Sequence, residues 1–281
     1  MRILLGLTLL FSSLISFCQD RKPFSIGLSG GGYFANKHTG FRYDGSDIEY
    51  INEGEYTNGY DVEWLLQNTS NTNSIYNQIK RKYDDLDFDV ADDGYPFPVN
   101  YRPAISFGIH TGYFLNDNTE FFIDADFVKL KVEQAITFEV FDPSIQTAEQ
   151  RIEIEVLTGS ERRLNFDAGF HVDFGQDLKS TPFFEAALNI TNVRVEESAL
   201  VVQGAKYVMT AWRKNNPLLN IVDFGGTSIG GTGGVGYRYK FSDQLTADVG
   251  YKGIFNKINL GPKTSQAYKL QNLIYLRILW L

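Results

Sequence analysis

The sequence predicts an all-β fold: a transmembrane, antiparallel up-and-down β-barrel of about eight strands with long extracellular loops. Three observations lead to this prediction. Segments of strict apolar/polar alternation recur along the chain. An export signal opens the sequence, yet no later stretch reaches the roughly 18 continuous apolar residues of a transmembrane helix. Short turns and long excursions alternate between the segments, as they do in barrels that cross a membrane.

The clearest alternation runs from Leu164 to Phe174. Its first set is Leu164, Phe166, Ala168, Phe170, Val172 and Phe174, and its second is Asn165, Asp167, Gly169, His171 and Asp173. Successive side chains of a strand point to opposite sides, so one side is apolar and the other carries charge. Because many segments repeat this pattern, we interpret the apolar side as facing lipid and the polar side as lining a barrel interior. The alternative is a soluble periplasmic or secreted β-sandwich.

Residues 1–18 have the pattern of a secretory signal peptide, with one Arg before an apolar run too short to span a membrane. Ser16-Phe17-Cys18 is a small-x-small site, so we expect cleavage before Gln19; a lipidated Cys18 is the alternative. Cys18 is the single cysteine, and its removal leaves neither disulfide nor thiol chemistry to the mature chain. The net charge of −8 argues against a nucleic-acid partner.

The expected barrel domain, residues 19–281, has strands of a length that suits a tilted membrane crossing. We place the strands at 24–34, 103–115, 120–132, 163–175, 182–194, 229–241, 245–257 and 269–280. Short turns lie at 116–118, 176–181 and 242–244, and long loops at about 35–102, 133–162, 195–228 and 258–268. Outer-membrane barrels have short periplasmic turns and long extracellular loops, so we expect both termini in the periplasm.

Two long loops contain further periodic segments. In the first loop, apolar residues at helical spacing predict a short amphipathic helix from Ser74 to Asp84. In the second loop, residues 134–141 and 150–157 alternate on either side of Asp142-Pro143-Ser144. We therefore expect the third and fourth strands to continue above the membrane as a hairpin.

Specific motifs support a resemblance to a known family. Gly233–Tyr251, with the sequence GGVGYRYKFSDQLTADVGY, resembles the strand–turn–strand hairpin of eight-stranded outer-membrane β-barrels of the OmpA-type and PorT-like kinds. Gly112–Glu120 resembles an earlier hairpin of this kind, and Leu276–Leu281 is similar to the C-terminal strand signal, although Trp280 is next to last. The resemblance covers most of residues 24–281 outside the loops and implies the barrel fold. We expect no peptidoglycan-binding domain of the OmpA kind.

Strand phase assigns a set of ionisable residues to the barrel interior. They are Asp124, Asp126, Asp167, His171, Asp173, Glu185, Arg238, Lys240, Asp248, Lys252 and Arg277. An eight-stranded barrel is just wide enough for side chains to fill it, and buried charges need partners. We therefore predict a paired lumen charge network, with a narrow proton or ion path as the alternative. His110 also points inward, and with His171 and nearby carboxylates it offers a metal site or an acid–base pair as a further alternative.

Two other motifs suggest ligands only weakly. Asp85, Asp87 and Asp89 have the first spacing of a calcium loop, but Val90 replaces the required Gly and Pro96 the required Glu. We expect a solvated acidic strand edge there, with weak divalent-cation binding as the alternative. The paired glycines between 225 and 234 lack the Gly-Lys-Ser/Thr of a phosphate loop and suit strand curvature instead.

The loops are rich in aromatic residues, which suit protein contacts. The candidates for interaction are Tyr60, Trp64, Tyr76, Tyr83 and Trp212. We expect a non-catalytic structural or accessory subunit of an outer-membrane transport or secretion assembly, with lipid and surface proteins as partners and no cofactor. PorT-like barrels include such subunits, and secretion is named on that resemblance alone. The alternatives are a narrow or gated pore for small solutes or ions and, less strongly, a lipid-modifying enzyme, because His171-Val172-Asp173 lacks a Ser at the matching spacing.

Overall fold

The computed structural model describes residues 24–260 and 267–281, apart from short segments within the loops. The segments left out are 41–42, 46–47, 52–53, 58–61, 68–73, 97, 146–149, 176–178 and 210–224, together with 261–266. The expected signal peptide, Cys18, Tyr60 and Trp212 lie outside the described residues. In the described part, no helix has the length and apolarity needed to cross a membrane.

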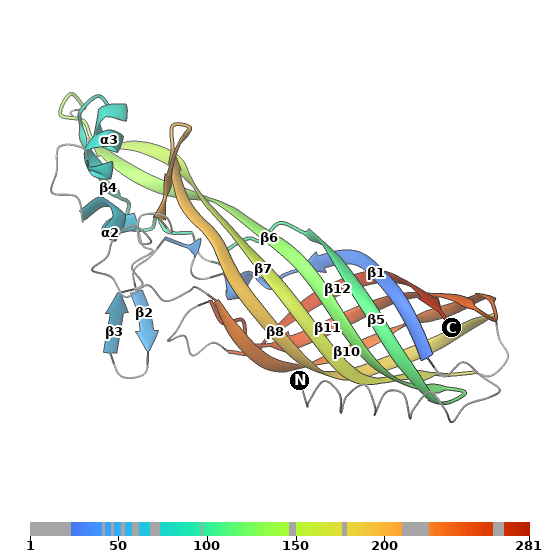
Figure 1. Cartoon of the computed structure of the whole chain (residues 1–281). Helices are drawn as coiled ribbons and strands as arrows, with labels where there is room; N and C mark the ends of the chain where they lie inside the picture. The colour runs from blue at the N-terminus through green and yellow to red at the C-terminus, as the bar shows by residue number, and fades with distance from the viewer. Residues whose placement is uncertain are drawn as a thin grey trace, which may run out of the picture.

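A closed ring of eight antiparallel strands forms the barrel within the described residues (Figure 1). The strands are β1 (Phe24–Phe34), β5 (Ala104–Asn116), β6 (Thr119–Phe141), β7 (Arg151–Asp173), β8 (Ser180–Val202), β10 (Gly225–Ser242), β11 (Leu245–Asn256) and β12 (Lys269–Trp280). Chain neighbours pair with each other, and the β8–β10 and β1–β12 pairings complete the ring. The predicted fold, an antiparallel up-and-down transmembrane barrel, is confirmed.

The alternation of the sequence determines the two sides of the barrel wall. On β7, Phe166 and Phe170 are exposed on the outside, whereas Asp167 and His171 are buried on the inside. The outer wall continues around the ring, and Leu188 on β8 is 72% exposed. So much exposed apolar surface is stable only against lipid, which explains why the polar face of each strand points inward.

The strands β6, β7 and β8 each have 23 residues and rise well past the other strands of the ring. Their upper parts form an arm (Figure 1), which is widened by β4 (Asp87–Val90) against β6 and by β9 (Ala205–Val208) against β8. The predicted continuation of strands three and four is therefore correct. The expectation of a loop from residue 195 is wrong, because β8 continues to Val202 after a bulge.

The first long loop is folded upon this arm. It contains a 3₁₀ helix η1 (Lys37–Thr39), the hairpin β2 (Ile48–Ile51) and β3 (Gly54–Thr57), and the helices α2 (Val62–Gln67) and α3 (Ile75–Lys82). The predicted helix is thus present as α3, and the side chain of Ser74 accepts a hydrogen bond from the Asn77 amide at its N-terminus. The other elements of this loop were not predicted.

The core of the arm joins the first loop to the three long strands. Buried residues of α2, α3 and β4 pack on the inward side of β6, β7 and β8. The members are Val62, Leu65, Leu66, Ile79, Tyr83, Phe88, Ile136, Phe138, Val140, Leu157, Leu200, Val202, Tyr207 and Met209. The molecule therefore has two differently built parts, a barrel with a polar interior and an arm with an apolar interior.

Candidate functional site: the lumen charge network and the arm

The lower lumen is filled by charged side chains that come from almost every strand of the ring. Arg238 on β10 donates to Asp248 on the neighbouring β11, with Nε–Oδ1 2.8 Å and Nη2–Oδ2 3.0 Å. Across the lumen, Arg238 also reaches Glu120 at 3.1 Å and Asp173 at 3.2 Å. The guanidinium is 3% exposed, so all of its charge is balanced by protein groups.

Arg277 on β12 forms the second centre of the network. Its guanidinium donates to Asp248 at 3.1 Å through Nε, lies 3.4 Å from Asp124, and pairs with Glu185. Its Nη1 also lies 2.8 Å from Nδ1 of His110. Asp248 is shared by Arg238 and Arg277, so the two centres form one connected system.

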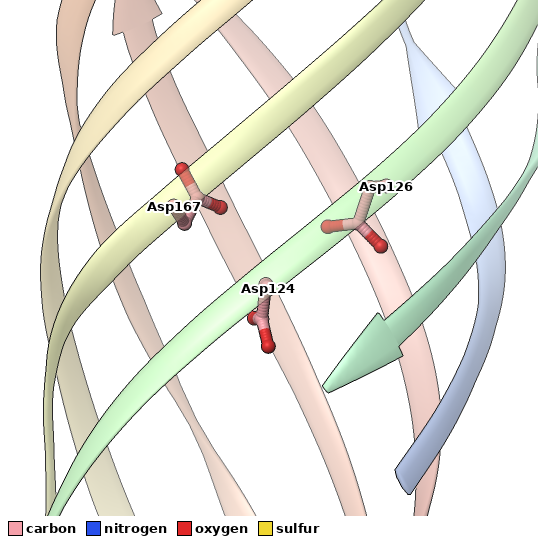
Figure 2. A group of neighbouring side chains, drawn as sticks. All are labelled: Asp124, Asp126 and Asp167. Atoms are coloured by element: carbon pink, nitrogen blue, oxygen red, sulfur yellow. The ribbon is translucent and has the colours of Figure 1, made fainter. Parts of the chain in front are cut away.

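Lys252 on β11 is the third centre of the network. Its ammonium group lies among three carboxylates, which in the described part of the chain are the one group with a spacing suited to a metal ion. Figure 2 shows these carboxylates, Asp124 and Asp126 on β6 and Asp167 on the neighbouring β7. The Lys252 ammonium lies 2.5 Å from Asp124, 3.4 Å from Asp167 and 3.8 Å from Asp126. The amine therefore holds the position a cation would need, and the triad is explained as an ion-pair cluster.

The two inward histidines are each held between two carboxylates. His110 lies 2.5 Å from Asp124 and 3.2 Å from Glu120. His171 lies 3.0 Å from both Asp173 and Glu185. Both ring nitrogens of each histidine are thus engaged with buried partners, and the side chains are fully buried. This geometry balances charge and leaves no reactive atom open to a substrate.

The structure departs from the predicted lumen set in two respects. Lys240 is exposed, because it lies beyond the lowest layer of the barrel, near the Ser242 end of β10. Glu120 belongs to the network, although it lies next to a turn in the sequence. The strand phase already places Glu120 on the same side as Asp124, four residues earlier in the same predicted strand.

Above the charge network, the lumen is closed by larger side chains. Tyr33, Val128, Leu130, Ile254 and Leu273 form a buried apolar layer. Beside Val128 and Leu130, on the neighbouring β7, lies a buried pair in which Arg163 donates from Nε to Glu161 at 2.6 Å. Tyr43 and Tyr101 both donate to the same Glu161, at 2.9 Å and 3.2 Å. This pair is also absent from the predicted lumen set, although Arg163 begins the predicted strand 163–175 and lies on the same side as Asn165 and Asp167.

The aromatic loop candidates separate into core and surface residues. Tyr83 is buried and donates to Glu155 at 2.9 Å, and burial together with this acceptor raises the pKa of Tyr83. Tyr76 stacks on Phe88 and donates to Asp87 at 3.0 Å. Trp64 lies in α2, and its side chain is outside the described part. Tyr83 therefore stabilises the arm, and the partner-facing surface has to be sought elsewhere.

The acidic run on β4 does not form a cation site in the described structure. Asp87 pairs with Lys80 of α3, and Asp89 accepts a hydrogen bond from the adjacent Val90 amide. The hydrogen bonds from Lys80 and Tyr76 hold the pKa of Asp87 below its ordinary value. Asp85 stands in the turn before β4 with φ of 62°. The carboxylates of Asp87 and Asp89 thus serve separate local contacts.

The upper end of the arm exposes apolar side chains that no described residue covers. Phe141, Ile152 and Ile154 on the outward side of β6 and β7 are 43%, 52% and 69% exposed. They lie far along the strands from the lipid-facing wall, and charged residues such as Lys131 and Glu133 separate the two apolar surfaces. We call these three residues the arm patch.

Comparisons with known proteins give matches among solved structures alone. No protein-family model and no curated protein matches the chain. Among solved structures, Neisserial surface protein A is similar with a TM-score of 0.41 and 11% identity, over 93% of this chain and 99% of that one. The outer membrane protein OprG from Pseudomonas aeruginosa gives a TM-score of 0.40 and 8% identity, over 92% and 96%. Ail of Yersinia pestis, in complex with the heparin analogue sucrose octasulfate, gives 0.34 and 8%, over 92% and 99%.

All three TM-scores are below 0.5, so the fold is assigned from the structure of this chain alone. The assignment as an outer-membrane β-barrel rests on the closed antiparallel ring, the apolar outer wall and the polar interior.

Proposed function

We propose that this outer-membrane barrel is a non-catalytic structural or accessory subunit of a surface assembly, and that it binds a protein partner through its extracellular arm. The observation that carries the proposal is the arm itself. Three strands of 23 residues continue far beyond the membrane wall and present the arm patch at their upper end. A transport or secretion role for the assembly is an extension of the sequence resemblance to PorT-like barrels.

The closed lumen supports an interaction role over a pore. The charged layer around Arg238 and Arg277 is buried, and the apolar layer around Leu130 lies above it. An eight-stranded barrel has room for such side chains but not for a water-filled path beside them. We therefore place the function at the surface of the protein. Outside the lipid-facing wall, the arm patch is the surface that exposes apolar side chains to a partner.

The proposal includes an orientation. β1 begins and β12 ends at the same end of the barrel as the turns between β5 and β6 and between β10 and β11. Short turns face the periplasm in barrels of this kind, so both termini would be periplasmic and the arm extracellular.

A double variant of the arm patch tests the proposed function. We expect Ile152→Ser/Ile154→Glu to assemble as wild type, because both side chains are more than half exposed. The variant should lose co-purification of the partner from native membranes, and it should also abolish a photocross-link formed from position 141. Tyr268→Ser, at an exposed aromatic residue outside the arm, is the matched control and should keep both signals. Unchanged co-purification by the double variant would refute the role of the arm patch.

A further inference from the structure

A row of three cations crosses the outward side of β6, β7 and β8 at the base of the arm. Lys129 is directly opposite Arg162, and Arg162 is directly opposite Arg194 on the next strand. The side chains of Lys129 and Arg162 are 47% and 54% exposed, and Arg194 is exposed as well. Like charges placed directly opposite each other destabilise a sheet, so this row requires negative charge from another source.

The protein supplies one carboxylate to the row. The pairing of β7 with β8 shifts register between Ser160 and Glu161, which leaves Glu196 as the additional residue of a β-bulge. The Glu196 carboxylate lies 2.6 Å from the Lys129 ammonium and also pairs with Arg162. Burial raises the pKa of Glu196, but the hydrogen bond from Lys129 and the charge of Arg162 outweigh it and hold the pKa below its ordinary value.

Positive charge therefore remains in excess after this pairing. Within the described part of the chain, no ion pair is formed by Arg194, and a single carboxylate serves both Lys129 and Arg162. All three side chains point away from the barrel, and among the described residues no second carboxylate pairs with them, so the row is suited to an anionic group from its surroundings.

The position of the row relative to the lipid-facing wall indicates which part of the membrane the three cations meet. Below it, the outward residues of β7 from Leu164 to Phe174 are all apolar, and Phe127 and Ile190 continue this wall on β6 and β8. This stretch has the roughly 9–11 residues with which a tilted strand crosses the hydrocarbon region. The cations thus lie at the upper edge of the lipid-facing wall, where lipid headgroups begin.

We propose that Lys129, Arg162 and Arg194 bind the phosphate of an outer-leaflet lipid, whose acyl chains lie on the apolar wall of β6, β7 and β8. Arginine forks suit phosphate oxygens in pairs, and lysine adds a point charge. A lipid fits better than a free phosphate ion because the apolar wall continues directly below Lys129 and Arg162, with Phe127 and Leu164, and below Asn192 on β8, with Ile190. The site lies on the outward side of the base of the arm and is separate from the arm patch, so it does not depend on the proposed protein partner.

Native mass spectrometry of the purified full chain in detergent micelles tests the site. The probe is diphosphoryl lipid A, with its dephosphorylated form and inorganic phosphate as comparisons. We expect wild type to retain lipid A. The triple variant Lys129→Gln/Arg162→Gln/Arg194→Gln should bind lipid A on the order of a hundredfold more weakly, because each cation near a lipid surface contributes about fivefold to the affinity. Heat-modifiable migration on gels reports that each variant is folded.

Two further variants separate this site from general attraction between cations and lipid. Lys179→Gln/Lys240→Gln removes two exposed cations at the short-turn end and should leave lipid A binding unchanged. Glu196→Gln should bind lipid A about fivefold more tightly, because it frees Lys129 and Arg162 from their carboxylate. Equal binding by the triple variant and wild type would overturn the proposal. An equal loss in the short-turn control, or equal affinity for the dephosphorylated lipid, would overturn it as well.

Discussion

The barrel and the arm share the strands β6, β7 and β8, yet the inward sides of these strands have opposite chemistry in the two parts. On β6 the inward residues of the barrel include Glu120 and Asp124, whereas those of the arm include Ile136 and Phe138. The outward side of β6 changes from apolar to charged, from the exposed Phe121 in the barrel to Lys129 and Lys131 at the base of the arm. Strand geometry therefore fixes only the alternation of the side chains. The medium on each side of the strand decides which side is apolar.

The change takes place over a short distance. Phe127 is the last apolar outward residue of the β6 wall, and Lys129 is the next outward residue. On β6 the inward side becomes apolar at the same level, with Val128 and Leu130, whereas β7 places the buried pair of Arg163 and Glu161 beside them. Both sides change together because the lipid ends there: above it, the outward side meets water and the inward side is covered by the first loop.

The largest expected effect comes from the polar interior of the barrel. Arg238→Ala would leave Asp248, Asp173 and Glu120 without their shared cation, and breaking a buried pair costs about 3–5 kcal/mol. Urea unfolding in micelles, followed by heat-modifiable migration, measures the change. Lys240→Ala, on the same strand but exposed, is the control and should be neutral. If the two variants unfolded at the same urea concentration, the lumen would be hydrated and the comparison with the arm would fail.

A smaller loss of stability is expected from a change in the apolar interior of the arm. Leu157→Ala removes a buried side chain that packs among residues of α2 and β6, at a cost of about 2–5 kcal/mol. We expect the arm to become sensitive to protease while the barrel keeps its heat-modifiable migration. Thr158→Ala, at the neighbouring half-buried residue on the outward side of β7, serves as the comparison. Loss of the barrel in the Leu157 variant would show that the two parts fold as one unit.

The outward sides provide a third test. Phe170→Arg places a cation on the lipid-facing wall, which costs about 2–4 kcal/mol near the midplane. Ile154→Arg changes a side chain that is more exposed, 69% against 51%, but it lies on the arm. We expect only Phe170→Arg to reduce assembly into lipid vesicles. If both variants assembled equally, the wall around Phe170 would not contact lipid, and the change of medium at Lys129 would be unsupported.

The sequence allowed the barrel to be predicted because alternation is a local property of each strand. The phase of β7 around Asp167, and the turns beside it, follow from neighbours within a few residues. The interior of the arm could not be predicted in the same way, since Val62 and Leu157 meet across distant parts of the chain. The bulge at Glu196 interrupts the alternation of β8, so the period of two residues does not predict the strand beyond it.

The smallest expected effect concerns a single ion pair at the surface of the arm. Asp87 on β4 accepts hydrogen bonds from Lys80 and Tyr76, which lower its pKa in the folded chain. Its pKa in the unfolded chain is about 3.9. The pair therefore stabilises the arm at every pH above about 4, and this contribution is lost as the pH falls through the lower folded pKa.

We accordingly expect the urea midpoint of the arm in Asp87→Asn to lie slightly below that of wild type by a constant amount between about pH 5 and pH 8. The difference should disappear under acid conditions, where the wild-type carboxyl is protonated and resembles the amide in charge. Asp89→Asn is the matched control, because the Asp89 carboxylate accepts only from the neighbouring Val90 amide among the described contacts. A difference between Asp87→Asn and wild type that persisted in acid would mean that Asp87 supports the arm by shape and not by charge. The arm would then resemble an ordinary soluble domain, in which surface pairs contribute little, while the barrel depends on its buried ones.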